Sequence, residues 1–236
     1  MSRRHVSKIK RAETNDIGIV LLAYETGQKP KSHISRYLLS TDNGESVIER
    51  QSKIISEVFS ENSLYIATGS DCDKIASVMP KNVRIVENQN FQSTGAAEYI
   101  RLVINNSTER SLLIIDGNIL FSEDVLLDLD FSKSFVLCLE GINEQQDIGA
   151  TISEGRISQF SFGLKSKICD MIFLKDHELN LAEKICKNRD KNKLLIFEVL
   201  NFVVNNGGSI HPHTPKRSSS IKKIESAKDV YENSNI

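Results

Sequence analysis

The sequence has 236 residues, of which 30 are basic and 31 acidic, and its formal net charge is −1 at pH 7. This balance argues against a protein that binds nucleic acid along its whole surface, and the length and 39% hydrophobic content suffice for one large domain or two small ones. The four cysteines lack CxxC spacing and no apolar run reaches membrane length, so we expect a cytoplasmic protein with reduced thiols and no membrane partner.

The first segment, residues 1–16, is rich in lysine and arginine and poor in apolar residues. We predict a flexible basic arm here, which is either a solvated tail or a contact for phosphate or an acidic partner. The rest of the chain, residues 17–236, shows no internal repeat and no linker. We predict that it forms a single domain.

The first half of this domain alternates apolar strands with amphipathic helices. The predicted strands are 17–23, 63–68, 83–86 and the first part of 111–121. The predicted helices are 46–59, 73–79 and 96–105, and a short extended piece is expected at 36–39. Such alternation is typical of βαβ units, so we predict an α/β fold with a mostly parallel, Rossmann-like sheet flanked by helices.

The second half indicates an antiparallel extension. Segments 148–152 and 156–162 flank Ser153-Glu154-Gly155, a pattern that predicts a hairpin. Further predicted strands are 135–139, 171–174 and 221–224. Further predicted helices are 179–187, 193–206 and 227–233, and a loop is expected at 209–220.

Polar residues follow two of the buried strands directly. The stretch SLLIIDGNILF at 111–121 places Asp116 and Asn118 at the carboxyl end of a central strand, where a parallel sheet binds ligands. These side chains could hold a hard cation or a ribose, or Asp-Gly-Asn could simply be a turn. The loop at 24–31 carries lysines that could bind phosphate, although it lacks both GxxxxGK[ST] and GxGxxG.

Several segments occur in an order that resembles one known family. They read IGIVLLAYETGQK from Ile17, SRYLLSTDNGESVIERQ from Ser35, ENQNFQSTGAAEYI from Glu87, LLIIDGNILF from Leu112, DIGATISEGRISQF from Asp147 and IKKIESAKDVYEN from Ile221. Their order is similar to that of the sugar-phosphate nucleotidyltransferases and their choline-phosphate cytidylyltransferase relatives. The resemblance implies a GT-A-like fold and Mg²⁺-dependent transfer of an NMP from an NTP to a phosphorylated acceptor, with release of pyrophosphate.

The resemblance also implies roles for individual residues. Positions that match phosphate-binding residues are Lys29 and Arg36. Positions that match nucleotide-binding segments are Ala23, Tyr24, Gly27, Thr94 and Gly95. Glu198 matches a position that contacts the acceptor, and the metal-binding positions fall on Asn118 and Glu225, with Asp116 as a further candidate.

Some of these positions depart from the family pattern. Asn118 is an amide where the family has a charged metal ligand, and Asp116 could supply the missing charge from the same side of the strand. Tyr24 and Glu25 stand where small residues let the backbone approach phosphate. The alternative hypothesis is therefore a catalytically degenerate domain that serves as a binding or assembly module, with a homo-oligomer or another protein as partner.

Two other motifs suggest further alternatives. Asp128-Leu129-Asp130 has the DxD form used by glycosyltransferases of the same fold, but it follows a predicted helix rather than the central strand. His211 and His213 have H-x-H spacing that could bind a metal, although polar loop histidines also explain it.

Overall fold

The computed structural model describes residues 16–24, 34–59, 62–139, 141, 144–216, 221–233 and 236. The predicted basic arm, apart from Asp16, lies outside these residues. So do Gly27 and Lys29, together with most of the loop after the first strand.

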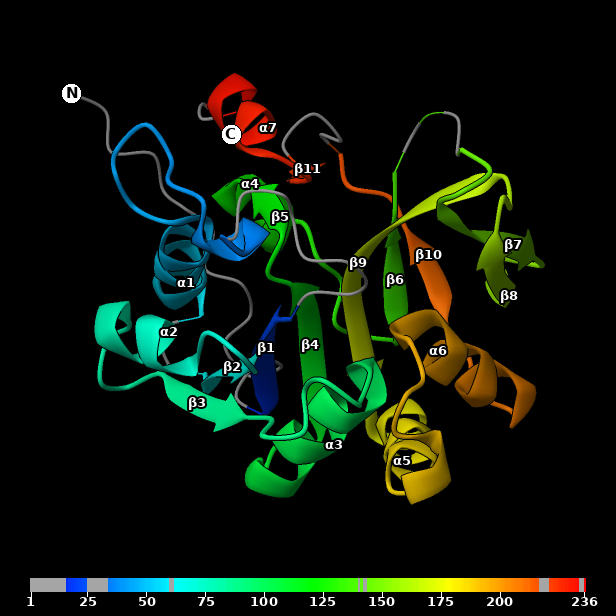
Figure 1. Cartoon of the computed structure of the whole chain (residues 1–236). Coiled ribbons are helices and arrows are strands. Elements are labelled where there is room, and N and C mark those ends of the chain that lie inside the picture. The colour runs from blue at the N-terminus through cyan, green and yellow to red at the C-terminus, as the bar shows by residue number, and fades with distance from the viewer. Residues whose placement is uncertain are drawn as a thin grey trace.

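The described residues form a mixed α/β fold built on a nine-stranded sheet (Figure 1). The strands of this sheet are β1 (Ile17–Ala23), β2 (Leu64–Thr68), β3 (Arg84–Glu87), β4 (Ser111–Asp116), β6 (Phe135–Cys138), β7 (Ile148–Ser153), β8 (Arg156–Phe162), β9 (Ser166–Lys175) and β10 (His211–His213). Along the sheet the order is β10-β6-β9-β4-β1-β2-β3, with β7 and β8 attached beside β9. Strands β4, β1, β2 and β3 are parallel and β9 is antiparallel to its neighbours, so the predicted architecture is confirmed.

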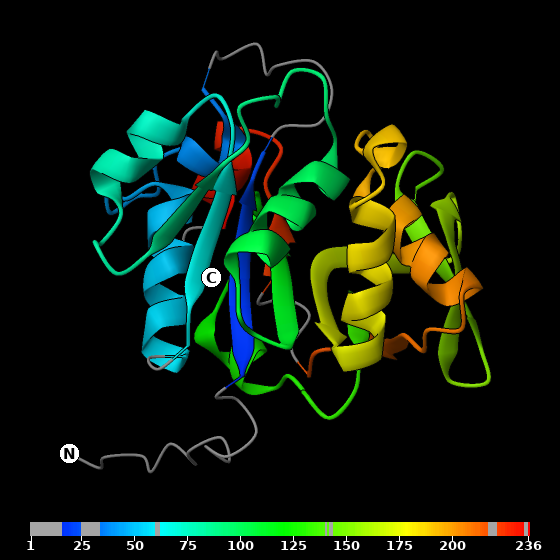
Figure 2. The same cartoon turned by 90° about the horizontal axis from the view of Figure 1, so that it is seen from below.

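The helices lie on both faces of this sheet (Figure 2). They are α1 (Val47–Val58), α2 (Cys72–Val78), α3 (Ala96–Asn106), α4 (Glu123–Leu127), α5 (Asp176–Cys186), α6 (Ile196–Asn205) and α7 (Ala227–Glu232), with short 3-10 turns η1 (Arg36–Leu38) and η2 (Arg189–Lys191). Within the described ranges, every helix is too short or too polar to span a bilayer.

Strand alternation divides the core into two layers. All seven residues of β1 are buried, because successive side chains of a central strand enter opposite faces. Val20 and Leu22 pack in the layer under α3, α5 and α6, whereas Ile19 and Leu21 pack in the layer that contains α1 and α4. A continuous apolar run in the sequence is thus the signature of a strand covered on both sides.

The predicted start of α1 is confirmed in detail. The Ser46 backbone N–H donates to Glu49 Oε2 at 2.8 Å, and the Glu49 N–H donates back to Ser46 Oγ at 3.4 Å. This reciprocal capping box satisfies amides that the first turn leaves unpaired, and such a cap is worth about 1 kcal/mol.

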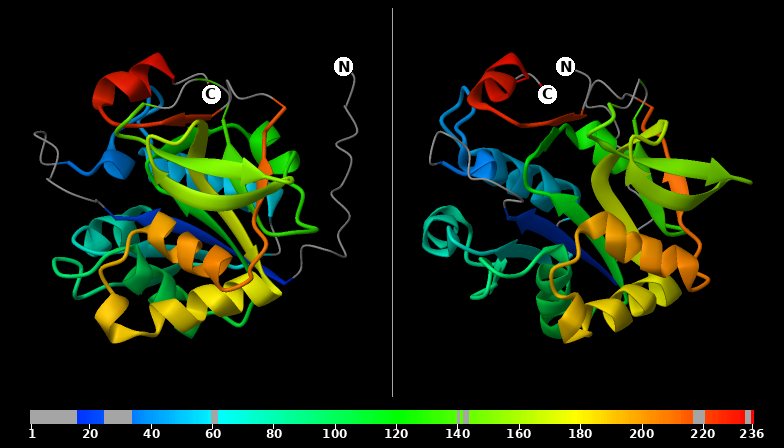
Figure 3. Two further views of the ribbon diagram at one scale, coloured as in Figure 1. Left: turned by 90° about the vertical axis from the view of Figure 1, so that its right-hand side faces the viewer. Right: turned by 45° about the vertical axis from the view of Figure 1, so that its right-hand side comes forward.

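A second, two-stranded sheet returns the end of the chain to the centre. Strand β11 (Ile221–Lys223) pairs antiparallel with β5 (Ile119–Phe121), so that Lys223 lies opposite Ile119. Helix α7 follows β11 directly (Figure 3). It buries Val230 in a cluster with Val47 and Leu120. The two segments that resemble the family's metal-binding motifs are therefore adjacent in space.

Two local predictions were wrong. Residues 36–38 are a 3-10 turn rather than an extended piece, because Tyr37 turns into the core and is only 1% exposed. Residues 211–213, expected in a loop, form β10 at the outer edge of the sheet, parallel to β6. Pro212 lies in this strand, and an edge strand tolerates a residue that cannot donate a ladder hydrogen bond.

Candidate active site

The carboxyl ends of the parallel strands lie along one edge of the sheet, which we call the strand-end edge. The β-sheet register pairs Ala23 with Thr68, Thr68 with Glu87, and Leu22 with Asp116. The polar residues that follow these strands are therefore neighbours. Open α/β sheets bind their ligands at such an edge.

Asp116 and Asn118 lie at this edge, beside the segment that carries Glu225. Asp116 ends β4, and its Oδ1 accepts the backbone N–H of Asn118 at 2.9 Å, which stabilises the turn into β5. The Ile224 N–H donates to the Asn118 carbonyl oxygen at 2.7 Å, so the β5–β11 pairing continues to the residue before Glu225. Asp-Gly-Asn is thus a turn, as one interpretation of the sequence expects, and its carbonyl at Asn118 contacts the residue before Glu225.

The donor atoms at this place are of the kind that binds Mg²⁺. Asn118 is 4% exposed, and its Oδ1 is buried and accepts no hydrogen bond from any described residue. Such an orphaned oxygen, two residues after Asp116 and next to the segment that carries Glu225, suits a hard cation. In the described part of the chain no cluster of three His, Cys, Asp or Glu could bind a metal, so the Asn118 amide would have to complete the set.

Two charged residues that the sequence did not single out lie at the same edge. Lys223 Nζ is 3.7 Å from Asp170 Oδ2, which joins β11 to β9. Partial burial alone would lower the pKa of Lys223, but the carboxylates of Asp170 and Asp116 outweigh it and raise that pKa. The sequence signal for Asp170 was the acid itself, since it interrupts the apolar stretch 168–174 of β9.

Tyr24 lies near this group of charges and packs against Tyr99. Its ring lies 5.1 Å from the ring of Tyr99, centroid to centroid. Burial, followed by the negative charges of Asp116 and Asp170, raises the pKa of Tyr24 well above its ordinary value. The side chain that replaces a small residue of the family pattern therefore occupies space beside the candidate metal ligands.

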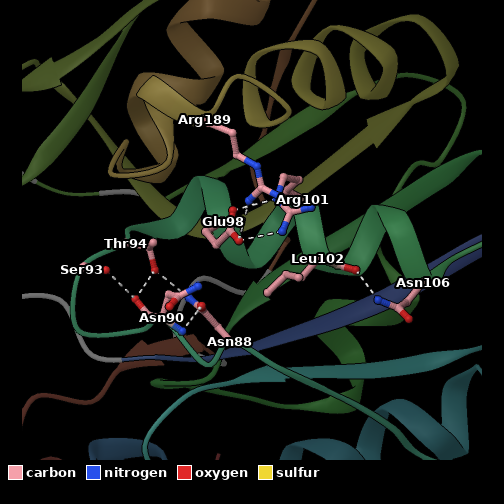
Figure 4. Close-up of polar contacts among 9 residues, drawn as sticks. All are labelled: Asn88, Asn90, Ser93, Thr94, Glu98, Arg101, Leu102, Asn106 and Arg189. Carbon is pink, nitrogen blue, oxygen red and sulfur yellow. Dashed lines mark hydrogen bonds and ion pairs between the residues drawn. The ribbon is translucent and has the colours of Figure 1, made fainter.

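The loop after β3 is held by its own polar groups (Figure 4). Asn88 Nδ2 donates to Thr94 Oγ1 at 2.9 Å, and that hydroxyl donates to the Asn90 carbonyl oxygen at 2.9 Å. The Gly95 N–H donates to the Asn192 carbonyl oxygen at 2.8 Å. Nucleotide binding by Thr94 and Gly95 stays a prediction. Because the Thr94 hydroxyl and the Gly95 N–H are already hydrogen-bonded, a nucleotide would contact other atoms of these two residues.

A buried ion pair fixes the helix that follows this loop. Arg101 donates to both carboxylate oxygens of Glu98 at 2.7 Å, and Arg189 adds a third contact at 3.4 Å (Figure 4). The hydrogen bonds from Arg101 are the main cause that lowers the pKa of Glu98. Because Arg189 precedes the segment that contacts Gly95, the pair ties α3 and the 189–194 segment together.

The backbone around Arg36 is held by Asp71. Asp71 Oδ2 accepts from Ser35 Oγ at 2.5 Å and from the Tyr37 hydroxyl at 3.0 Å, and Lys74 Nζ lies 2.9 Å from the other oxygen. The residues on both sides of Arg36 are thereby attached to the start of α2. Sequence reasoning missed Asp71, because its partners Ser35 and Tyr37 are more than 30 positions away and follow no motif.

We expect Asp71→Asn to lower the free energy of unfolding at pH 7 by about 1–3 kcal/mol, since a charged acceptor is lost. Burial would raise the pKa of Asp71, but hydrogen bonds from Ser35, Lys74 and Tyr37 outweigh it and lower that pKa. A carboxyl with a lowered folded pKa stabilises above its unfolded pKa and loses this contribution as pH falls through the folded pKa. Urea unfolding at pH 7 and pH 3 should therefore show a difference from wild type that shrinks in acid.

The matched control for this experiment is Asp73→Asn, an exposed acid in the first turn of the same helix. It should change the free energy of unfolding by less than about 0.5 kcal/mol. A loss for Asp71→Asn that is equal at both pH values would contradict the assigned charge.

The fold was compared with known proteins. The sequence matches no family model and no curated protein. The inositol-1-phosphate CTP transferase of T. maritima is similar in structure, with a TM-score of 0.70 and 15% identity over 93% of this chain and 95% of that one. The CTP:phosphocholine cytidylyltransferase of Streptococcus pneumoniae has a TM-score of 0.68 and 18% identity over 91% and 96%.

A third similar structure is HddC from Yersinia pseudotuberculosis, complexed with GMP-PN, with a TM-score of 0.67 and 15% identity over 92% of this chain and 98% of that one. The chain has the nucleotidyltransferase fold. The family suggested by the sequence segments is thus the one whose fold the structure shares, over nearly the whole chain.

The remaining candidates occupy other parts of this nucleotidyltransferase fold. Glu198 Oε2 accepts the Leu195 N–H at 2.8 Å and so takes part in the start of α6, which leaves its acceptor-binding role a prediction.

The two alternative motifs also have partners of their own. Asp128 of the DxD motif forms an ion pair with Lys216. The His213 ring lies 5.2 Å from the Phe135 ring, centroid to centroid, at an angle of 39°, and its Nε2 has no hydrogen-bond partner in the described chain. His211 contacts Gly155 instead, so the two histidines have separate surroundings.

Proposed function

We propose that this protein is an Mg²⁺-dependent nucleotidyltransferase, which transfers an NMP from an NTP to a sugar-phosphate or phosphocholine-like acceptor. The observation that carries the proposal is the β5–β11 pairing, which brings the segment of Glu225 beside Asp116 and Asn118 at the strand-end edge. The similarity in fold to proteins described as CTP transferases supports it.

The proposed reaction is an in-line displacement. A phosphate oxygen of the acceptor attacks the α-phosphorus of the NTP and forms a new P–O bond. The bond between this phosphorus and the oxygen that bridges to the β-phosphate breaks, and its electron pair leaves with pyrophosphate. Such a reaction needs charge neutralisation and alignment rather than a covalent intermediate.

The residues of the chain then have separate roles. Asp116, Asn118 and Glu225 would hold Mg²⁺, which when bound neutralises charge on the phosphates. Arg36, which Asp71 positions through Ser35 and Tyr37, donates to phosphate oxygens, and a guanidinium does so in a bidentate manner. Lys29 is proposed as a second phosphate contact, and Ala23, Tyr24 and Gly27 as the nucleotide-binding segment.

A screen for pyrophosphate release tests this function. Each of the four NTPs is offered with a panel of sugar phosphates, phosphocholine and inositol phosphate in the presence of Mg²⁺. We expect release with at least one pair, and a loss of about 100-fold or more in Glu225→Ala, because the variant lacks a charge that stabilises the transition state. Glu232→Ala, at an exposed acid of α7, is the control and should retain wild-type turnover.

One specific observation favours a second function, a non-catalytic binding module. Tyr24 fills space beside the candidate ligands, and Asn118 brings no charge to a cation. This function gives no pyrophosphate release with any pair. It predicts instead either nucleotide binding without turnover or a stable oligomer, which thermal-shift and light-scattering measurements detect.

A further inference from the structure

A serine and a histidine at the start of β10 form a hydrogen-bonded pair that takes no part in the proposed transfer. Ser209 Oγ lies 3.3 Å from His211 Nε2. Both residues are half-buried, so that solvent reaches each of them. A nucleophile and a base at about this distance are the first requirement of covalent catalysis by serine, and the contact is often looser before a substrate binds.

The hydrogen bond at the other ring nitrogen decides which atom of this pair donates. His211 Nδ1 lies 3.1 Å from the carbonyl oxygen of Gly155. Because a carbonyl oxygen only accepts, Nδ1 carries the hydrogen, and in the neutral imidazole Nε2 is then an acceptor. The Ser209 hydroxyl is therefore the donor of the 3.3 Å contact. In this tautomer a histidine can remove the proton of a serine, with the carbonyl of Gly155 as the group that orients it.

Three elements of the fold hold the serine and the histidine in place. The Ser209 N–H donates to Glu178 Oε1 of α5 at 2.9 Å, and the His211 N–H donates to the Ser134 carbonyl oxygen at 3.0 Å. Ser134 Oγ donates in turn to Glu178 Oε2 at 2.9 Å. Since Ser134 precedes β6, the pair is attached to α5, β6 and β10 at once.

The β7–β8 hairpin brings the orienting carbonyl to this pair. Gly155 lies in its turn with φ +73°, a conformation that glycine adopts without strain. The Ile157 N–H donates to the Ile210 carbonyl oxygen at 2.8 Å. The hairpin is thus also attached to the residue between Ser209 and His211.

The pair lies away from the strand-end edge. Strands β4 and β6 are both antiparallel to β9 and so run in the same direction. His211 pairs with Phe135, the first residue of β6, whereas Asp116 is the last residue of β4. Because β10 is parallel to β6, Ser209 lies beyond the amino-terminal ends of these strands. Chemistry at Ser209 is therefore separate from a nucleotide bound near Asp116.

We propose that Ser209 is a nucleophilic serine, activated by His211, that is acylated by an activated carboxylic ester. Ser209 Oγ attacks the carbonyl carbon of the ester and forms a new C–O bond, while its proton passes to His211 Nε2. The bond between this carbon and the leaving oxygen breaks, its electron pair leaves with that oxygen, and the leaving group takes the proton from His211. The products are an acyl-serine, an alcohol or phenol, and the neutral histidine.

The surroundings of Ser209 predict a single acylation rather than rapid turnover. An efficient serine hydrolase stabilises the oxyanion of its intermediate with backbone N–H groups. The Ser209 N–H is already donated to Glu178, and the Gly208 N–H is donated to the Val203 carbonyl oxygen at 2.9 Å. Hydrolysis of the acyl-serine is therefore slow, and the modified protein accumulates.

Incubation with p-nitrophenyl acetate, followed by mass spectrometry of the peptides, tests this site. We expect Ser209 to be acetylated about 100-fold faster than Ser158, because a general base accelerates such a step by about 10²–10⁴. Ser158 is the internal control, since it is exposed on β8 and its hydroxyl donates to the Thr151 carbonyl oxygen at 3.2 Å rather than to a histidine. Hydroxylamine, which cleaves esters but not amides, distinguishes acetyl-serine from acetyl-lysine.

Two variants assign the roles. Ser209→Ala should remove the hydroxylamine-sensitive acetyl group from this peptide. His211→Ala should slow the acetylation of Ser209 by about 100-fold, and added imidazole should restore part of the rate, which a residue that merely supports the hairpin would not allow.

Equal acetylation of Ser209 and Ser158 in the wild-type protein would overturn the inference without recourse to any variant. Acetylation of Ser209 at the wild-type rate in His211→Ala would overturn it too. Both results would leave the proposed transfer of an NMP intact, because that reaction uses the strand-end edge.

Discussion

Gly95→Ala is expected to lower the free energy of unfolding by about 3 kcal/mol, at the upper end of what overpacking costs. A Cβ at this position would lie 2.3 Å from the carbonyl oxygen of Lys193 and 2.7 Å from its carbonyl carbon. Both atoms belong to the backbone. The hydrogen bonds Gly95 N–H to Asn192 O, at 2.8 Å, and Ala97 N–H to Leu194 O, at 3.1 Å, hold the two chains at this separation.

Urea unfolding at neutral pH measures the effect. Ser93→Ala is the control in the same loop, because Ser93 is exposed and its hydroxyl donates to the Asn90 carbonyl oxygen over a long 3.2 Å. It should change stability by less than about 0.5 kcal/mol. Equal stability of the two variants would contradict the close approach of segments 88–95 and 192–194.

Asn118→Asp is expected to make stability depend strongly on Mg²⁺. In EDTA the variant should be less stable than wild type by about 2 kcal/mol, because Asn118 is 4% exposed and the new carboxylate lies beside Asp116. In Mg²⁺ the added charge should reverse this loss. A ligand at 100 times its Kd stabilises by about 2.7 kcal/mol, which is several degrees in Tm.

Thermal unfolding of wild type and variant over a Mg²⁺ titration checks this expectation. Asn105→Asp, at an exposed position of α3, is the control and should show a Tm independent of Mg²⁺. An unchanged response to Mg²⁺ in Asn118→Asp would contradict the assignment of this edge as a metal site. It would then favour the non-catalytic module.

The candidate site and the fold were accessible from the sequence to different degrees. Asp116 could be placed at a strand end because the apolar run before it is continuous and ends abruptly. Asn118 follows Asp116 in the same stretch, whereas Glu225 was placed beside them only through the resemblance, because nothing local in IKKIES indicates that it pairs with 119–121. The structure confirms the proximity of these two segments through the β5–β11 pairing.

The local sequence pattern could not predict the conformation of the shortest elements. Residues 36–38 and 211–213 are three-residue elements, too short for a periodicity of 2 or 3.6 to be recognised. Their conformation follows from distant partners, since Tyr37 is held by Asp71 and β10 pairs with β6. Gly95 likewise needs to be glycine because of a segment almost 100 positions later.

The sequence by itself determined the buried parallel strands, the capping box of α1, the hairpin at Glu154-Gly155 and the polar strand end at Asp116. These features depend on neighbours within a few residues, whose periodicity and capping chemistry are visible in the chain. Only the tertiary structure brought Lys223 and Asp170 to that strand end and attached Asp71 to the residues around Arg36. Such contacts depend on which strands become neighbours in the sheet, which is decided by the packing of the whole core.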